Sequence, residues 1–174
     1  MPDIITSCCF SGHRSAKLPW GNNEDSPLYI RLKEEIAKAV AGLIDDGYRH
    51  FICGMAQGSD IYFAEAVIEN IKNNTEISLE AAIPFEGHAD SLSDEASYRY
   101  ENILSYCCCI SVFSEKYDMQ CMQLRNMYMV DSSSAIVSVF DGQSGGTLST
   151  LKYAKRRGLL VVGLPVPGAG DGIL

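Results

Sequence analysis

Short apolar runs alternate with longer segments of helical periodicity along most of the chain. The runs have the length of β-strands and fall at about residues 4–10, 50–54, 79–84, 107–113, 134–140 and 159–164. Between most of them, apolar residues recur every three or four positions, as on one face of a helix. Five such segments are predicted, at about residues 30–44, 61–71, 93–104, 122–130 and 148–157.

The predicted strands are apolar throughout, without the alternation of a sheet that is wet on one side. Continuous apolar strands separated by helices are typical of a parallel sheet that is covered on both faces. The pattern therefore predicts an α/β, Rossmann-like, three-layer α/β/α sandwich with a mostly parallel sheet. We expect a single domain over residues 1–174, with a loose Pro- and Gly-rich tail at about 165–174.

Composition agrees with a globular protein that has a substantial core. Of the 174 residues, 47% are apolar and 21% charged. No apolar run is long enough to span a bilayer, and the N-terminus lacks the pattern of a signal peptide. We therefore expect a cytoplasmic protein without membrane partners.

The seven cysteines are interpreted as structural. They include no C-x-x-C pair, and several are adjacent in apolar runs. Neighbouring residues on a strand point to opposite faces, so adjacent cysteines are poorly placed to share one ion. We expect free thiols in a reducing compartment and no metal site.

Charge disfavours extended nucleic-acid binding, because the formal net charge is −8. The one local basic cluster is interpreted as a solvated helix end, where the helix dipole favours cations. It comprises Lys152, Lys155, Arg156 and Arg157.

Polar and glycine residues follow five of the predicted strands. In an open parallel sheet, ligands bind beyond the carboxyl ends of the strands, so these segments are expected to converge on one rim. The rim segments are 11–14, 54–60, 84–88, 114–117 and 141–147.

The segment from Asp141 to Thr147 has the order strand, glycine turn, helix start. Glycines allow close approach of a ligand, and the free N–H groups of a first helical turn attract an anion. Gly145, Gly146 and Thr147 are therefore candidate ligands of a phosphate, with Asp141 beside them.

A second turn of this kind brackets Gly54 and Gly58 and opens a helix with Ser59 and Asp60. Ser59 and Asp60 have two alternative roles. One is helix N-capping, worth about 1 kcal/mol; the other is binding of ligand hydroxyls, as an acidic residue binds ribose.

Gly12, His13 and Arg14 follow the first predicted strand. Arg14 is expected either to bind a phosphate through two hydrogen bonds or to lie in a surface turn. His13 is expected either to transfer a proton or to lie in the same surface turn. His50 is expected to be structural, because it opens its strand at the opposite end. We assign no role to His88.

Three further features have two interpretations each. Trp20 either stacks on a base or fixes its loop to the core. Arg125 either reaches the rim or solvates its helix. The Met-rich segment 120–131 is interpreted as core or as an interface, which leaves a homo-oligomer or a protein partner possible.

The order and spacing of these motifs resemble the YpsA-type branch of the SLOG superfamily, which is named after DprA/Smf DNA-processing proteins and LOG enzymes. The resemblance covers about residues 4–164. It implies a Rossmannoid fold that binds a nucleotide or nucleotide-derived ligand. The motifs are Ser11-Gly12-His13-Arg14, Lys17-Leu18-Pro19-Trp20-Gly21, Gly54-Met55-Ala56-Gln57-Gly58-Ser59-Asp60, Arg125-Asn126 through Asp131, and Asp141-Gly142 through Thr147.

The resemblance also implies roles for single residues. Gly54, Gly58 and Asp60 match a G-x-A-x-G-x-D element, and Arg125 stands about where LOG enzymes carry a catalytic arginine. LOG phosphoribohydrolases continue P-G-G-x-G-T-x-x-E, and the position of that glutamate is Thr150 here. Glu86, Glu115 or Asp141 would have to replace it, so LOG activity is in doubt.

Three functions follow as hypotheses. The first is a sensor or regulatory module that binds a nucleotide-like ligand at the rim. The second is a hydrolase or transferase acting on a nucleotide N-ribosyl bond, with a rim carboxylate and Arg125. The third is DprA-like binding of single-stranded DNA, which the net charge of −8 disfavours.

Overall fold

Six strands alternate with five α-helices in the computed structural model, which describes residues 3–169. The strands are β1 (Ser7–Gly12), β2 (His50–Cys53), β3 (Ser78–Ile83), β4 (Cys107–Val112), β5 (Ala135–Phe140) and β6 (Leu160–Pro165). The helices are α1 (Pro27–Asp45), α2 (Ser59–Ile71), α3 (Asp94–Tyr106), α4 (Cys121–Asp131) and α5 (Gly146–Arg157). Each expected element is confirmed, with boundaries within a few residues.

Local chemistry explains where several helices begin and end. Ser26 and Ser93 accept N–H groups in the first turns of α1 and α3, at 3.3 Å in each case. Gly158 ends α5 in the left-handed conformation, with φ of +79°. The first strand begins later than expected, because Asp3 accepts the N–H of Ile5 and starts a 3₁₀ turn over Ile4–Thr6.

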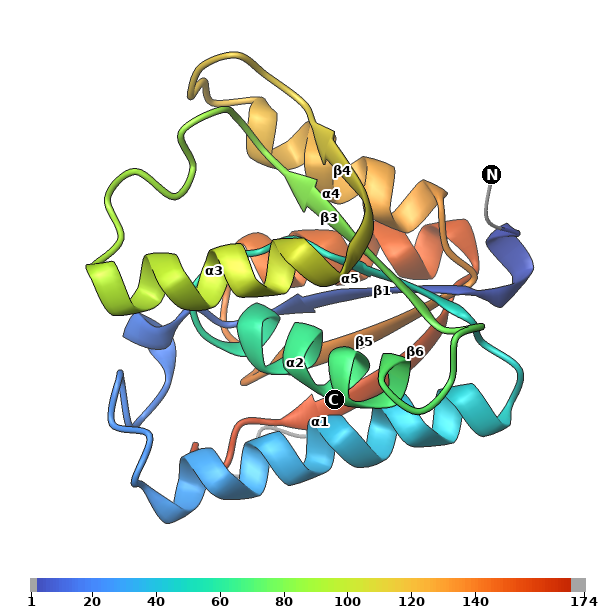
Figure 1. Ribbon diagram of the computed structural model, residues 1–174, viewed down its shortest axis with the longest axis horizontal. Coiled ribbons are helices and arrows are strands. Elements are labelled where there is room, and N and C mark those ends of the chain that lie inside the picture. Colours follow the sequence, from blue (N-terminus) through green and yellow to red (C-terminus); the bar gives the residue numbers. More distant parts are fainter. Residues whose placement is uncertain (1–2, 170–174) are drawn as a thin grey trace.

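All strand pairs are parallel, in the order β4-β3-β2-β1-β5-β6. Consecutive strands run outward from β1 to β4 on one side, and β5 and β6 continue on the other side. The order reverses between β1 and β5, and a crevice opens at such a point beyond the carboxyl ends of the strands. The arrowhead of β1 points to the left in Figure 1, toward the loops that surround this crevice.

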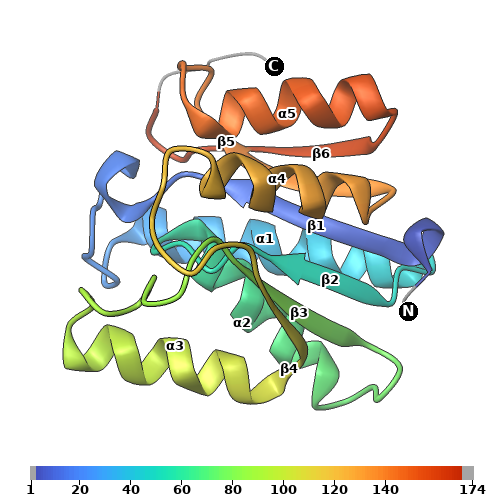
Figure 2. The ribbon, with the colours of Figure 1, turned by 90° about the horizontal axis from the view of Figure 1, so that it is seen from above.

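Two layers of helices cover the sheet, which makes a three-layer α/β/α sandwich. Helices α1, α2 and α3 pack on one face around Phe10, Phe51 and Phe63. Helices α4 and α5 pack on the other face around Ile52 and Ile136. Figures 1 and 2 show the two groups of helices on opposite sides of the strands.

Strand β4 departs from the expectation of a fully covered sheet. It is an edge strand, and Cys108 and Cys109 are exposed. Ile110 and Val112 are 49% and 47% exposed. An apolar sequence run indicates a strand, but it does not distinguish a central position from an edge.

The C-terminal segment also differs from expectation where it is described. Strand β6 continues to Pro165, Val166 is buried in the core, and Ala169 donates its N–H to the Val166 carbonyl at 3.2 Å. The rest of the expected loose tail, residues 170–174, lies outside the described residues. None of the helices in residues 3–169 is both long and apolar enough to cross a bilayer.

Candidate functional site

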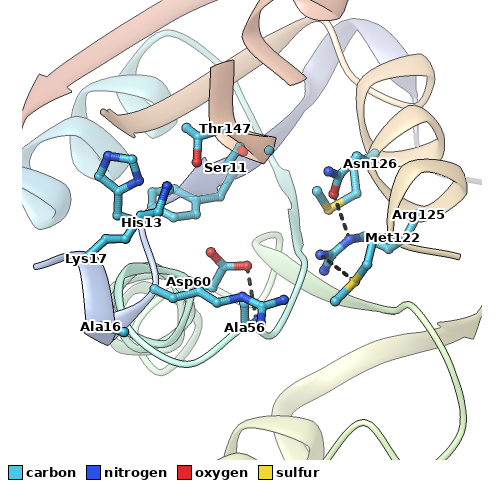
Figure 3. Close-up of a pocket in the computed structure, with 15 residues that line it drawn as sticks. Ser11, His13, Ala16, Lys17, Ala56, Asp60, Met122, Arg125, Asn126 and Thr147 are labelled. Atoms are coloured by element: carbon cyan, nitrogen blue, oxygen red, sulfur yellow. Dashed lines mark hydrogen bonds between the residues drawn. The ribbon is translucent and has the colours of Figure 1, made fainter. Parts of the chain in front are cut away.

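A cavity of about 420 Å³ lies at the carboxyl edge of the sheet, where the strand order reverses. Four segments line it: the end of β1 with its loop, the β2–α2 turn, α4, and the first turn of α5. Figure 3 shows side chains from all four around one space, with Lys17 and His13 facing Arg125 and Asn126 across it.

The loop after β1 is fixed against the start of α2. Ser59 donates two hydrogen bonds to the carbonyl of His13, one from its N–H at 3.2 Å and one from its hydroxyl at 2.8 Å. Gly58 has φ of +107°, and a Cβ there would lie 2.9 Å from the carbonyl carbon of Arg14. Glycine is therefore required at position 58 by backbone packing as well as by conformation.

Three amides of the β2–α2 turn, those of Met55, Ala56 and Ser59, are engaged by the protein itself. The N–H of Met55 points to Cys53 Sγ at 3.4 Å, and that of Ala56 donates to Asp60 Oδ2 at 3.3 Å. A Cβ on Gly54 would overlap Arg125 Nη1. Gly54, Gly58 and the fully buried Ser59 thus build the framework of this turn.

Asp60 places a buried carboxyl group against the cavity. The residue is 5% exposed, and within residues 3–169 only Oδ2 of the carboxylate accepts a hydrogen bond. Burial raises the pKa of Asp60 to about 6, although Arg125, the Ala56 N–H and Arg14 act in the opposite direction. The carboxyl group can accept a hydroxyl or exchange a proton near neutral pH.

Arg125 brings a buried cation to the same cavity. It is 6% exposed, its Nη1 donates to the carbonyl of Gly54, and its Nε donates to Asn126 Oδ1 at 2.8 Å. Burial lowers the pKa of Arg125, but a guanidinium stays protonated in proteins. Among the described residues no carboxylate lies within ion-pair distance of it, so its charge is available to an anion.

The β5–α5 turn leaves its amides open. Gly145 caps α5 without a side chain, and the N–H groups of Gly146, Thr147 and Leu148 make no hydrogen bond within residues 3–169. Lys17 Nζ lies 3.1 Å from the position that a Cβ on Gly145 would take. A cation therefore accompanies the positive end of the helix dipole.

Asp141 lies beside this turn and fixes it. Its Oδ1 is 2.7 Å from His13 Nε2 and accepts the N–H of Gln143 at 3.0 Å. Burial alone would raise the pKa of Asp141, but the Gln143 N–H and His13 hold it below its usual range. The side chain thus joins the loop after β1 to the loop after β5.

The charged lining of the cavity is mostly cationic. Arg14, Lys17 and Arg125 face Asp60, which is the one carboxylate among the described lining residues. This local excess stands out in a chain with a formal net charge of −8. The cavity can hold an anion through charge and amide donors, and a hydroxyl through Asp60.

The structure brings together six of the residues expected at the site. They are Gly12, Arg14, Asp60, Arg125, Gly146 and Thr147. The other five lie around the cavity without lining it. They are Gly54, Gly58, Ser59, Asp141 and Gly145. Whether any of them contacts a ligand stays a prediction.

Lys17 and Met122 line the cavity and were absent from the expected set. Lys17 ends a short 3₁₀ turn over Ser15–Lys17, and its proximity to Gly145 depends on tertiary structure. The sequence signals for Lys17 are its position three residues after Arg14 and its place in the motif Lys17–Gly21 that carries the family resemblance. Met122 lies on the same side of α4 as Arg125 and Asn126.

Thr150 occupies the position of the LOG glutamate. It is 3% exposed, donates to the Gly146 carbonyl at 3.0 Å, and accepts Asn126 Nδ2 at 3.0 Å. Neither Glu86 nor Glu115 lines the cavity. Asp60 is the one carboxylate among the described lining residues, and it differs from the three substitutes that the sequence suggests, which are Glu86, Glu115 and Asp141.

Other residues singled out in the sequence have structural positions. Trp20 is buried in the core, as one interpretation held. His50 contacts Glu80 Oε2 at 3.1 Å and Ser78 Oγ at 2.9 Å, which confirms its structural role. His88 lies outside the cavity against Phe85, and burial lowers its pKa to about 4, together with the nearby charges of Arg125 and Arg14.

Comparison with known proteins identifies related sequences. The family model described as the YspA SLOG family matches residues 8–157. The chain is 32% identical over 145 residues to the uncharacterized SPbeta prophage-derived protein YoqJ of Bacillus subtilis, covering 75% of this chain and 84% of that protein. It is 25% identical over 142 residues to a UPF0398 protein of Staphylococcus epidermidis, covering 80% and 75%.

A solved structure shares the fold. DNA processing protein A (DprA) from Streptococcus pneumoniae superposes with a TM-score of 0.65 at 17% identity. The superposition covers 97% of this chain and 54% of that chain, so this protein spans about half the length of DprA. At this level of identity the likeness concerns the fold alone.

Proposed function

The chain belongs to the YspA SLOG family, and on that premise we propose that it binds a nucleotide or nucleotide-derived ligand by its phosphate group in the cavity at the carboxyl edge of the sheet. The observation that carries the proposal is the first turn of α5. Its amides are open, and the Nζ of Lys17 lies beside Gly145.

Opposite this turn, we expect Arg125 to bind the phosphate and Asp60 to bind the sugar of the ligand. The buried guanidinium supplies a second positive charge, and a charge-assisted hydrogen bond to phosphate is about twice as strong as a neutral one. Asp60 keeps one oxygen free of hydrogen bonds within residues 3–169, which suits a ribose hydroxyl.

The residue at the position of the LOG glutamate, Thr150, favours ligand binding without catalysis. Thr150 is buried and engaged with Asn126 and Gly146, so it offers no carboxylate. We therefore propose a sensor or regulatory role, in which a bound nucleotide alters contacts with a protein partner. The likeness to DprA supports no DNA-binding role here, because the formal net charge is −8.

Titration calorimetry with inorganic pyrophosphate and ADP tests this proposal. We expect binding to the wild type, and about tenfold weaker binding after Lys17→Ala, the effect of losing one charged hydrogen bond. Lys116→Ala is the matched control, because Lys116 is exposed and outside the cavity lining. No binding of either probe at millimolar concentration, or equal loss in both variants, would refute the proposal.

A second candidate is hydrolysis or transfer at an N-ribosyl bond, and the position of Asp60 favours it. A carboxyl group whose pKa is raised to about 6 can act as a general acid or base near neutral pH. Incubation with nucleoside monophosphates and chromatography of the products tests it. Free base that is released by the wild type and not by Asp60→Asn would support catalysis; its absence after long incubation would exclude it.

A further inference from the structure

A second cavity adjoins the proposed phosphate site. It has a volume of about 480 Å³ and lies between α4 and α5, with a lining that extends from Gly146 to Arg156 on α5. Met122, Asn126 and Gly146 line both cavities, so the two cavities are adjacent. We refer to this second cavity as the α4–α5 groove.

Methionines and a tyrosine give the groove its apolar lining. Met119, Met122 and Met127 line it together with Tyr153. The sequence interpretation of the Met-rich segment as core holds for Met129, which is buried, but Met127 is half-buried and Met119 is 92% exposed. Flexible thioethers make favourable contacts with aromatic rings, so this lining suits a flat ring better than an aliphatic chain.

Tyr153 is held in place by two neighbouring side chains. Its hydroxyl donates to Asp131 at 3.0 Å, and the guanidinium of Arg156 lies 5.7 Å from the ring centroid. A ring fixed in this way loses little freedom when a ligand packs against it. The lining includes Arg156 and no carboxylate, which is compatible with an anionic ligand.

One polar side chain in the groove has both a donor and an acceptor available. Gln123 is exposed and makes no side-chain hydrogen bond within residues 3–169. An amide of this kind can pair with the edge of a heteroaromatic base, which presents a donor beside an acceptor. Ser149 is also at this wall, but its hydroxyl donates to the Gly145 carbonyl at 3.2 Å.

We infer that the α4–α5 groove holds the base of the ligand whose phosphate lies at the start of α5. The inference rests on the proposed function and extends it. The site then recognises a planar base through Met127, Tyr153 and Gln123, and a phosphate through Lys17 and the α5 amides. The adjacency of the two cavities at Gly146 favours a single ligand that reaches both.

Calorimetry with pyrophosphate, ADP, GDP and UDP tests the inference on the full chain. We expect at least one nucleoside diphosphate to bind about tenfold or more tightly than pyrophosphate, because the base adds apolar contact. Met127→Ala and Gln123→Ala should each weaken that nucleotide about three- to tenfold and leave pyrophosphate unchanged. Leu124→Ala is the control, since Leu124 is exposed on the same helix and outside both linings.

The outcomes separate the two proposals. Pyrophosphate binding that depends on Lys17, with no gain from any base and no effect of Met127→Ala, would overturn the inference and leave the phosphate site standing. Failure of all four probes would overturn both. If Met127→Ala instead changed the mass measured by native mass spectrometry, a second copy of the chain would occupy the groove, and the inference would again be overturned.

Discussion

The two glycine turns of this protein look alike in sequence and differ in what lies against their amides. In the β2–α2 turn, Cys53 Sγ, Asp60 and the His13 carbonyl already engage the N–H groups of Met55, Ala56 and Ser59. In the β5–α5 turn, the first N–H groups of α5 make no such bond within residues 3–169.

The difference shows two uses of glycine at a strand–helix junction. At Gly58 the missing side chain makes room for the protein's own backbone, whereas at Gly146 a Cβ would meet no atom within 4 Å. A turn of the first kind places side chains such as Asp60 at the cavity. A turn of the second kind leaves donors for a ligand.

The largest expected difference between the two turns is in the unfolding free energy after a glycine in each is replaced by alanine. Gly58→Ala places a Cβ against the backbone of Arg14 at positive φ, and we expect a loss of about 3 kcal/mol or more in unfolding free energy. Gly146→Ala should stay within about 0.5–1 kcal/mol of the wild type, in the stabilising direction. Urea denaturation measures both, and equal losses would mean that the two turns are packed alike.

The next effect concerns Asp60 and depends on pH. Its folded pKa of about 6 lies above the usual value of 3.8, so the folded state binds more protons in that window and stability increases as pH falls through it. Asp60→Asn, which imitates the neutral acid, should therefore be more stable than the wild type at pH 7 by about 1–3 kcal/mol. The advantage should vanish below about pH 4.

Thermal or urea unfolding from pH 3 to pH 8 measures this difference. An Asn variant less stable than the wild type at pH 7 would mean that the charged carboxylate stabilises the fold, most directly through Arg125. Asp25→Asn is a suitable control, because Asp25 is exposed and its side chain makes no hydrogen bond or ion pair within residues 3–169. Substitution at this exposed position should leave the unfolding free energy within about 0.5 kcal/mol of the wild type.

The smallest expected effect is the change in stability when the hydroxyl group of Ser59 or of Thr147 is removed. Ser59→Ala removes a buried hydrogen bond of 2.8 Å to the His13 carbonyl, and we expect a loss of about 1 kcal/mol. The Thr147 hydroxyl has no partner within residues 3–169, so Thr147→Ala should change stability by less than about 0.5 kcal/mol. A calorimetric loss of pyrophosphate affinity in Thr147→Ala alone would sharpen the contrast between the turns.

The sequence predicted the fold well because its signals are local. Apolar runs, caps such as Ser93 and the glycine at position 158 each act within a few residues. The rim rule also brought Gly12, Asp60 and Gly146 to one cavity. The prediction that these residues meet requires only that the strands are parallel, because the carboxyl ends of parallel strands lie at the same edge of the sheet.

The remaining features depend on contacts between distant segments. Lys17 reaches Gly145 because a 3₁₀ turn redirects its loop, and Arg125 is buried because Gly54 leaves space for its guanidinium. The engaged amides of the β2–α2 turn depend on three separate groups, which are Cys53 Sγ, Asp60 Oδ2 and the His13 carbonyl. No periodicity encodes these relations, and the same holds for the exposure of β4.

The exposed edge of the sheet has a consequence for how copies of this protein behave in concentrated solution. Strand β4 carries no charged residue, and an uncharged edge is a template for pairing with a neighbouring chain. Mutual repulsion from a formal net charge of −8 opposes such contact at long range. At about 1 M salt the screening length shrinks to about 3 Å, so high salt should promote self-association along this edge.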